Sequence, residues 1–257
     1  MTDDGAAIAL LKRAVELDIE KRYTEALVCY KEGLQLLLEF IKVWIQKIGF
    51  AIPIFLIYKL NISFQTIHDK DKKAKYRLKA EEYLERSEKV HQIIAKEKEN
   101  GKYHEQIKIQ VNSIGYSYET IFGRFLENTV TSITVEDPYI RAHHQIVNFL
   151  RFCELCIRKC ANLRSVILLT TADANEQEQE AKLQELKQSL SQRNITLSWT
   201  FSTSLHDREV RLDSGWIIKI GRGLDIYKPP EGKMVLGYFD LELRKCLETT
   251  VDIFFQK

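Results

Sequence analysis

The chain has 257 residues, which is enough for one large domain or for two small ones that each bury a core. Its 38 basic and 36 acidic residues leave a formal charge of +2, so no overall basic surface selects a nucleic-acid partner. An anion site would have to be a local patch, and we expect no signal peptide because the first residues are acidic and polar.

Apolar side chains recur at helical spacing over residues 1–98, with one interruption. The repeats predict a first helix near residues 8–17, a second from about 24 to 41 and a third from about 71 to 97. In the first helix the apolar positions form two neighbouring strips, Ile8, Leu11 and Val15 beside Leu10, Ala14 and Leu17. Amphipathic helices of this kind predict a small three-helix bundle.

Three segments of this region, 11–18, 23–30 and 83–90, carry a narrower pattern, above all the Tyr-Leu-acid-Arg-small-Glu string that begins at Tyr83. They resemble the microtubule-interacting and transport (MIT) domain. That resemblance implies a three-helix bundle that binds short C-terminal helices of ESCRT-III subunits.

The third predicted helix offers a face for such a partner. Leu84 and Glu88 are four residues apart and share a side of the helix, which Glu81 and Glu85 adjoin. An apolar socket rimmed by carboxylates suits a partner helix with leucines and basic residues. The alternative is an ordinary solvated face, and the family resemblance favours the groove.

An apolar stretch at about 41–68 departs from the MIT pattern, which has a short loop there. The uninterrupted run over 48–58 is shorter than the roughly 20 residues of a membrane span, and Pro53 would kink a helix. Three interpretations stay open: an insert from alternative splicing or an erroneous gene model, a membrane-surface hairpin, and a true span. We favour the first, because the MIT-like pattern resumes at Lys72.

Residues 99–111 are predicted to form a linker, because this charged stretch lacks a sustained apolar stripe. From residue 112 to 257 strand and helix patterns alternate, which predicts an α/β layered domain. The expected helices cover 117–126, 143–160 and 176–193, and the expected strands cover 129–135, 164–169, 195–201, 209–212 and 216–220. The last two strands flank residues 213–215, a predicted hairpin turn.

The segments 135–141, 206–209 and 215–224 resemble the phospholipase D-like C-terminal domain that follows the MIT domain in a family of cytokinesis proteins. This resemblance runs through essentially all of residues 100–257. Together the two resemblances imply an α plus α/β chain, with a three-helix MIT domain joined to a phospholipase D-like α/β domain.

Phospholipase D enzymes use His-x-Lys-x4-Asp, usually twice, with one His attacking phosphorus and the other protonating the leaving group. His206, Arg208 and Asp213 have this spacing with Arg in place of Lys, and the sequence has no second copy. Arg still binds phosphate through its planar fork of donors, so we expect anion recognition without turnover. The alternative is a structural polar network. Further expected lipid contacts are Arg211, Lys219 and Arg222, and a backbone nest at 221–223 is a weaker candidate.

Five cysteines are present, of which Cys153, Cys156 and Cys160 share one predicted helix. Three thiols without a matching fourth ligand do not make a zinc site, so neither a metal nor a cofactor is expected. An odd number of free thiols suits a reducing, cytoplasmic compartment.

The two resemblances together imply a non-enzymatic adaptor that binds ESCRT-III tails and acidic phospholipid, with phosphoinositide as the expected lipid. They also imply a homodimer that acts in abscission at the end of cytokinesis, peripheral on late endosomes and at the midbody. One rival is a phosphodiesterase or nuclease that completes its His-motif site across a dimer. Another is a nucleic-acid binder, which the near-neutral charge and the lack of an aromatic RNA-binding motif disfavour.

Overall fold

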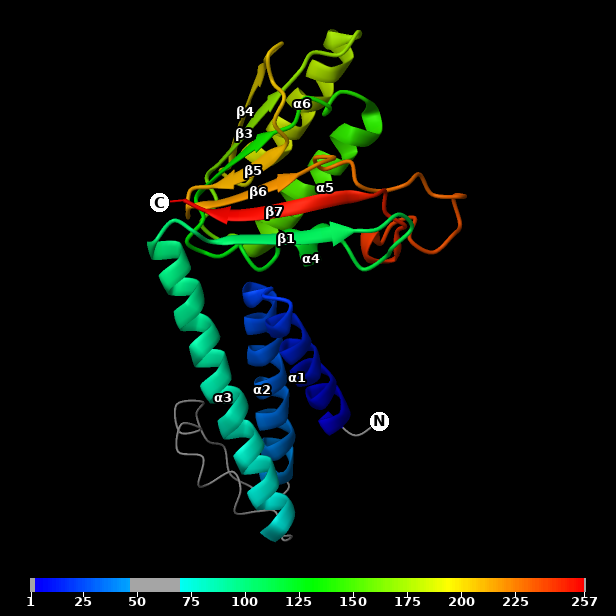
Figure 1. Ribbon diagram of the computed structural model, residues 1–257. Coiled ribbons are helices and arrows are strands. Elements are labelled where there is room, and N and C mark those ends of the chain that lie inside the picture. Colours follow the sequence, from blue (N-terminus) through cyan, green and yellow to red (C-terminus); the bar gives the residue numbers. More distant parts are fainter. Residues whose placement is uncertain (1–2, 47–69, 257) are drawn as a thin grey trace. The chain divides into compact units, whose positions relative to one another are not determined.

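The computed structural model describes residues 3–46 and 70–256, and it divides the chain into two compact units, Met1–Glu99 and Asn100–Lys257 (Figure 1). In the described part of the first unit, α1 spans Asp3–Ile19, α2 spans Tyr23–Gln46 and α3 spans Lys70–Glu99. The predicted helices are confirmed. Residues 41–46 of the predicted apolar insert continue α2, and residues 47–68 lie outside the described residues.

The helices of the first unit pack through small and apolar side chains. Gly33 of α2 lies so close to α1 that a Cβ atom there would be 2.9 Å from the Leu11 side chain. Of the two apolar strips of α1, only part is buried: Ile8 and Val15 are 41% and 37% exposed. The buried apolar side chains of these helices, within the described residues, are Ala7, Leu11, Ala14 and Leu17 of α1, Ala26, Tyr30, Leu34 and Leu37 of α2, and Ala80, Val90 and Ile94 of α3.

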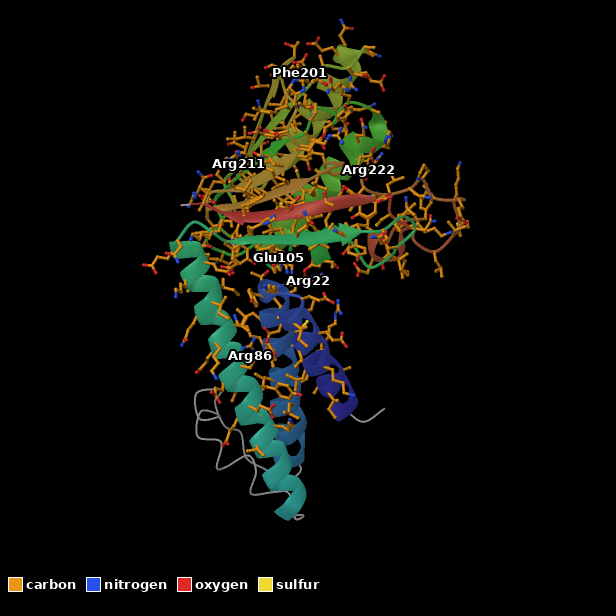
Figure 2. The ribbon with its side chains drawn as sticks, viewed as in Figure 1. Arg22, Arg86, Glu105, Phe201, Arg211 and Arg222 are labelled. Atoms are coloured by element: carbon orange, nitrogen blue, oxygen red, sulfur yellow. The ribbon has the colours of Figure 1, made fainter. Side chains whose placement is uncertain are left out.

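A polar network joins all three of these helices. The Asp18 carboxylate, only 5% exposed, accepts hydrogen bonds from Arg86 Nε at 2.5 Å and Nη2 at 2.6 Å (Figure 2). Tyr30 Oη donates to the same carboxylate at 3.1 Å, and burial raises the pKa of Tyr30 to about 12. The arginine of the string that begins at Tyr83 therefore holds α3 to α1.

In residues 100–256, all of which the structure describes, the strands form one seven-stranded sheet in the order β1-β7-β6-β5-β2-β3-β4. Strands β2, β3 and β4 are parallel, and the other neighbouring pairs are antiparallel. The helices α4, α5 and α6 lie against one face (Figure 1). The element bounds are β1 His104–Ile109, α4 Tyr118–Phe122, β2 Ser132–Glu136, α5 His143–Lys159, β3 Ser165–Thr170, α6 Glu176–Ser191, β4 Thr196–Phe201, β5 Glu209–Leu212, β6 Trp216–Ile220, the short 3-10 turn Leu241–Leu243 and β7 Thr249–Phe255.

Most predicted elements of this unit are confirmed, including the hairpin between β5 and β6. The linker predicted over 99–111 is wrong for residues 104–109, which form the edge strand β1. Alternate residues of β1 are buried, but one of them is Glu105, which forms an ion pair of 2.6 Å with Arg124. Because a charged residue occupies an inward position, the sequence does not show the usual alternation of a strand there. The sequence analysis also did not predict strand β7.

Candidate functional site

A hollow of about 210 Å³ lies at the carboxyl ends of the parallel strands. Such ends commonly bind ligands in α/β sheets. Its walls come from the loops that follow β2, β3 and β4. The described residues that line it are Pro138, Tyr139, Arg141, Thr171, Leu205, His206 and Arg208.

Two arginines meet the ring of Tyr139 in this hollow. The Cζ atom of Arg208 is 4.1 Å from the ring centroid, and that of Arg141 is 5.4 Å from it. Arg208 Nη1 also donates a 2.7 Å hydrogen bond to the Gly221 carbonyl. Neither the ring nor the carbonyl carries a charge that would neutralise the guanidinium groups, although the Asp137 carboxylate attracts that of Arg208. Arg141 is the site residue that sequence reasoning missed, since no motif spacing connects it to Arg208.

The buried Asp137 fixes the backbone beside the hollow. It accepts hydrogen bonds from the amides of Tyr139, at 3.0 Å, and Leu224, at 3.1 Å. Burial raises the pKa of this carboxyl above its usual range. Gly223 has φ of +62°, and a Cβ there would lie 1.9 Å from Asp137 Oδ2. The glycine therefore permits close packing against Asp137.

The weaker prediction of an anion-binding backbone nest at 221–223 is wrong. The amide of Gly221 donates to the Thr250 carbonyl at 3.0 Å, and that of Gly223 donates to the Ile220 carbonyl at 2.9 Å. These amides are committed to the sheet and its turn rather than to an anion.

The spacing of the phospholipase D motif does not assemble a catalytic trio. His206 and Arg208 precede β5 and Asp213 follows it, which puts roughly 13 Å of extended strand between them. The Asp213 carboxylate accepts a 3.1 Å hydrogen bond from the Thr131 amide and a 3.0 Å bond from the Ser132 amide. Asp213 thus fixes the start of β2.

The other predicted lipid contacts divide into two kinds. Lys219 lines a second hollow of about 340 Å³ together with His206 and Arg208, but its Nζ lies 3.0 Å from Glu209 Oε2. That hydrogen bond raises the pKa of Lys219. Arg211 bonds the same fully buried Glu209 and lies 3.9 Å from Glu136, so internal ion pairs use much of its charge. Arg222 is exposed and lines neither hollow (Figure 2).

The proposed partner face on α3 is exposed. Leu84 is 36% exposed, and Glu81, Glu85 and Glu88 are exposed with it. Glu85 forms an ion pair of 2.6 Å with Lys89, which lowers the pKa of Glu85. These four residues form a continuous surface strip on the helix.

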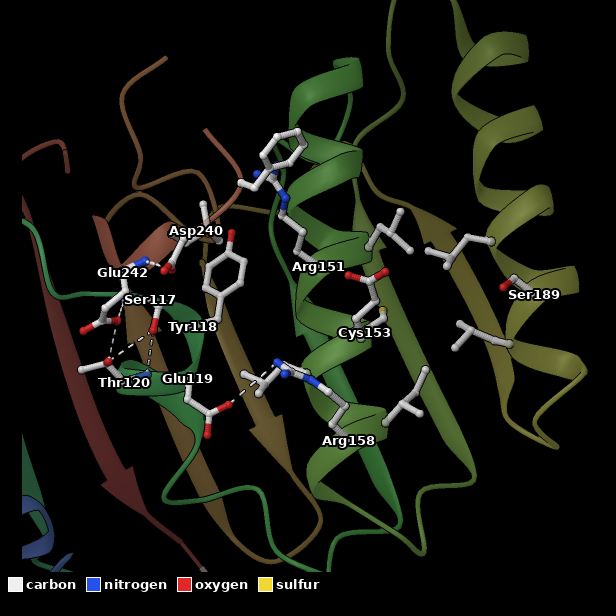
Figure 3. A pocket seen from close by; sticks show the side chains of 18 of the residues that line it. Ser117, Tyr118, Glu119, Thr120, Arg151, Cys153, Arg158, Ser189, Asp240 and Glu242 are labelled. Carbon is white, nitrogen blue, oxygen red and sulfur yellow. Dashed lines mark hydrogen bonds and ion pairs between the residues drawn. The ribbon is translucent and has the colours of Figure 1, made fainter. Parts of the chain in front are cut away.

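A larger groove of about 980 Å³ runs over the helical layer between α4, α5, α6 and residues 239–242 (Figure 3). Several of its charges are already matched. Glu119 pairs with Arg158 at 3.8 Å, and Glu242 Oε2 accepts hydrogen bonds from the Ser117 amide at 3.1 Å and Thr120 Oγ1 at 2.9 Å. The Cys153 thiol at its wall is buried, which raises its pKa and disfavours the reactive thiolate. These paired charges and the buried thiol leave the groove without an obvious reactive group.

Neither a metal cluster nor a membrane helix is found in the described parts of the chain. Within 3–46 and 70–256 there is no group of three or more His, Cys, Asp or Glu side chains that could hold a metal ion. Over the same residues, no helix combines the length and apolar character that crossing a bilayer requires.

Comparison with known proteins identifies both units. The family described as the phospholipase D-like domain at the C-terminus of MIT matches residues 115–255, and the MIT (microtubule interacting and transport) domain matches residues 5–47. MIT domain-containing protein 1 of Mus musculus is 45% identical over 258 aligned positions, which cover 100% of this chain and 94% of the mouse protein. An MIT domain implies binding to partner proteins, and its pairing with a phospholipase D-like domain supports an adaptor-type role. The chain belongs to the family of MIT domain-containing protein 1, with an N-terminal MIT domain and a C-terminal phospholipase D-like domain.

Proposed function

We propose that this chain is a non-enzymatic adaptor whose MIT domain binds ESCRT-III C-terminal tails and whose phospholipase D-like domain binds acidic phospholipid. It acts in abscission as a homodimer, in the cytoplasm, on late endosome membranes and at the midbody. The observation that carries the lipid part is the hollow formed by Arg141, Arg208 and His206, since no acidic residue is among the described residues that line it. Two forked guanidinium groups are well suited to phosphate oxygens.

The same hollow argues against phosphodiester turnover. Attack on phosphorus and protonation of the leaving group need two suitably placed groups. This chain contributes one histidine there, and Asp213 of the motif is engaged with Thr131 and Ser132 beyond the far end of β5. Arg208, which stands in place of the motif lysine, can still bind phosphate. The second histidine that turnover requires is missing from the hollow.

Vesicle flotation at low and high salt, beside a phosphodiesterase assay on lipid and nucleic-acid substrates, tests the proposal. Arg208→Gln is expected to weaken binding to phosphoinositide-containing vesicles roughly fivefold, since a basic residue near an anionic surface contributes about 1 kcal/mol. The matched control is Arg164→Gln, an exposed arginine of the same unit that lines neither hollow. Binding should fall at high salt.

Two results would contradict this proposal. Turnover that His206→Ala abolishes would favour a phosphodiesterase completed across a dimer, which the exposure of His206 permits. Equal binding to neutral and acidic vesicles would remove the anion site.

A further inference from the structure

The segment between Lys228 and Arg244 leaves the sheet and returns through a closed stem. Tyr227 pairs with Cys246, and the Lys228 amide donates to the Lys245 carbonyl at 2.9 Å. Figure 1 shows this segment, in orange, as an excursion beyond the ends of β6 and β7. Here we call residues 233–239 the tip.

Arg244 holds the tip to the stem from inside. The residue is 8% exposed, and its guanidinium donates to the carbonyls of Tyr238 at 2.6 Å, Lys228 at 3.2 Å and Gly237. Gly237 has φ of +80°, and a Cβ there would lie 2.7 Å from the Leu243 carbonyl oxygen. These contacts fix the backbone of the tip at Gly237 and Tyr238, and the Tyr238 amide also donates to the Val235 carbonyl at 3.1 Å.

This fixed backbone exposes large apolar side chains. Met234 is 96% exposed, Leu236 is 89% exposed and Phe239 is 82% exposed. Val235 between them is 42% exposed. Contiguous exposed apolar surface of this kind marks an interaction site in a water-soluble domain, because each side chain keeps an unfavourable contact with water until it is covered.

We propose that the tip inserts into the apolar layer of a membrane when the phospholipase D-like domain binds acidic lipid. This inference rests on the lipid-binding part of the proposed function. Met234 and Leu236 are nearly fully exposed and touch almost none of their own domain, so this part of the tip is a convex projection. Phe239 packs against Tyr238, with 4.8 Å between the ring centroids. A bilayer closes around such a projection, whereas a rigid protein partner would need a matching pocket for each side chain.

The charges near the tip suit acidic headgroups. Lys233 directly precedes Met234, and residues 233–239 contain this one basic residue and no acidic one. Lys228 lies at the stem, where its Nζ donates to the neutral Asn112 side chain at 2.7 Å, and the acidic Glu231 of the stem forms an ion pair of 2.7 Å with Lys245. An apolar end with lysines behind it matches the layering of acyl chains below headgroups.

Leu236→Ser in the full chain tests the insertion, with vesicles of phosphatidylcholine and phosphatidylserine as the probe. We expect roughly tenfold weaker vesicle binding, which corresponds to about 1.4 kcal/mol. Ile19→Ser is the matched control, because Ile19 is a 77% exposed apolar residue of the MIT domain. Unlike Arg208→Gln, Leu236→Ser should leave the salt dependence of the remaining binding unchanged, because it removes no charge.

A second readout measures depth directly. Tryptophan placed by Leu236→Trp should be quenched by lipids brominated along their acyl chains, and tryptophan placed by Ile19→Trp should not. Vesicle binding by the unsubstituted chain without this quenching, and with Leu236→Ser unchanged, would overturn the insertion and leave the lipid-binding function standing. No vesicle binding by any variant would overturn both. Self-association that Leu236→Ser abolishes, with vesicle binding unchanged, would assign the tip to a protein contact instead.

Discussion

At the scale of single residues, the structure gives fixed positions to side chains that the sequence places only by type. Arg86 belongs to the string that resembles an MIT domain, and its guanidinium holds the nearly buried carboxylate of Asp18. Arg211 and Lys219 were expected to contact lipid, yet both pair with Glu209. Strand register decides such pairings, because it places Glu209 opposite Lys219 on β6. A linear sequence does not give that register.

Arg86→Leu is expected to lower the free energy of unfolding of the MIT domain by about 2 kcal/mol, since it removes charge-assisted hydrogen bonds and leaves Asp18 nearly buried. Arg13→Leu is the control: its ion pair with Glu16 joins side chains that are 48% and 61% exposed, and its loss should cost less than about 0.5 kcal/mol. Urea unfolding followed by helical circular dichroism measures both. Equal effects would show that the Asp18 network is not stabilising.

Gly223→Ala is expected to destabilise the phospholipase D-like domain by about 3 kcal/mol, from ~1 kcal/mol of left-handed strain and ~2 kcal/mol of overpacking against Asp137. Gly101→Ala separates the backbone strain from the overpacking. Gly101 also has φ of +62°, but a Cβ there meets nothing within 4 Å. Thermal unfolding of both variants should show the larger loss for Gly223→Ala, and matched losses would contradict the role given to Asp137.

At the scale of elements, periodicity predicted the helices and the inner strands well because their inward positions are apolar. Strand β3, with Val166 and Leu168 buried, is such a case. Periodicity did not predict strand β1, because Glu105 occupies an inward position and its partner Arg124 lies outside the strand. Of the site, His206 and Arg208 were found from their spacing. Arg141 was not, because the loops after β2 and β4 meet only in the folded sheet.

Helix α3 carries a prediction of its own. Leu84→Asp places a charge in the proposed apolar socket and should weaken binding of ESCRT-III tail peptides by about 2 kcal/mol or more. Leu78→Asp is the matched control, since Leu78 is a 66% exposed leucine of the same helix outside the strip of Glu81, Leu84, Glu85 and Glu88. Fluorescence anisotropy with labelled peptides gives the affinities. An unchanged affinity in a Leu84→Asp variant that is still helical would show that the tail peptide does not bind at this face of α3.

At the scale of the whole molecule, the chain divides into two units that each bury a core. An adaptor needs both binding functions at once, and separate cores allow each surface to change without unfolding the other. The sequence indicated this division from the shift between helical and alternating patterns.

The two binding activities should therefore respond to substitutions independently. Leu84→Asp is expected to change vesicle affinity by less than about twofold, and Arg208→Gln to change tail-peptide affinity by no more, since the two residues belong to separate units with their own cores and independent sites are additive within about 0.5 kcal/mol. Peptide anisotropy and vesicle flotation on the same preparations check this. Loss of both activities in either variant would show that the two units are coupled.

The pairing of β1 with β7 has a consequence for how the protein is made. His104 lies opposite Phe254, so the first and last strands of the second unit are neighbours, and β7 lies between β1 and β6. During synthesis, β1 leaves the ribosome long before the strand that it needs. Contacts so distant along the chain form slowly, and the unpaired edge stays open to other chains meanwhile. A nascent chain halted before Thr249 would have the parallel strands but no place for β1, so chaperone contact should persist until β7 has emerged.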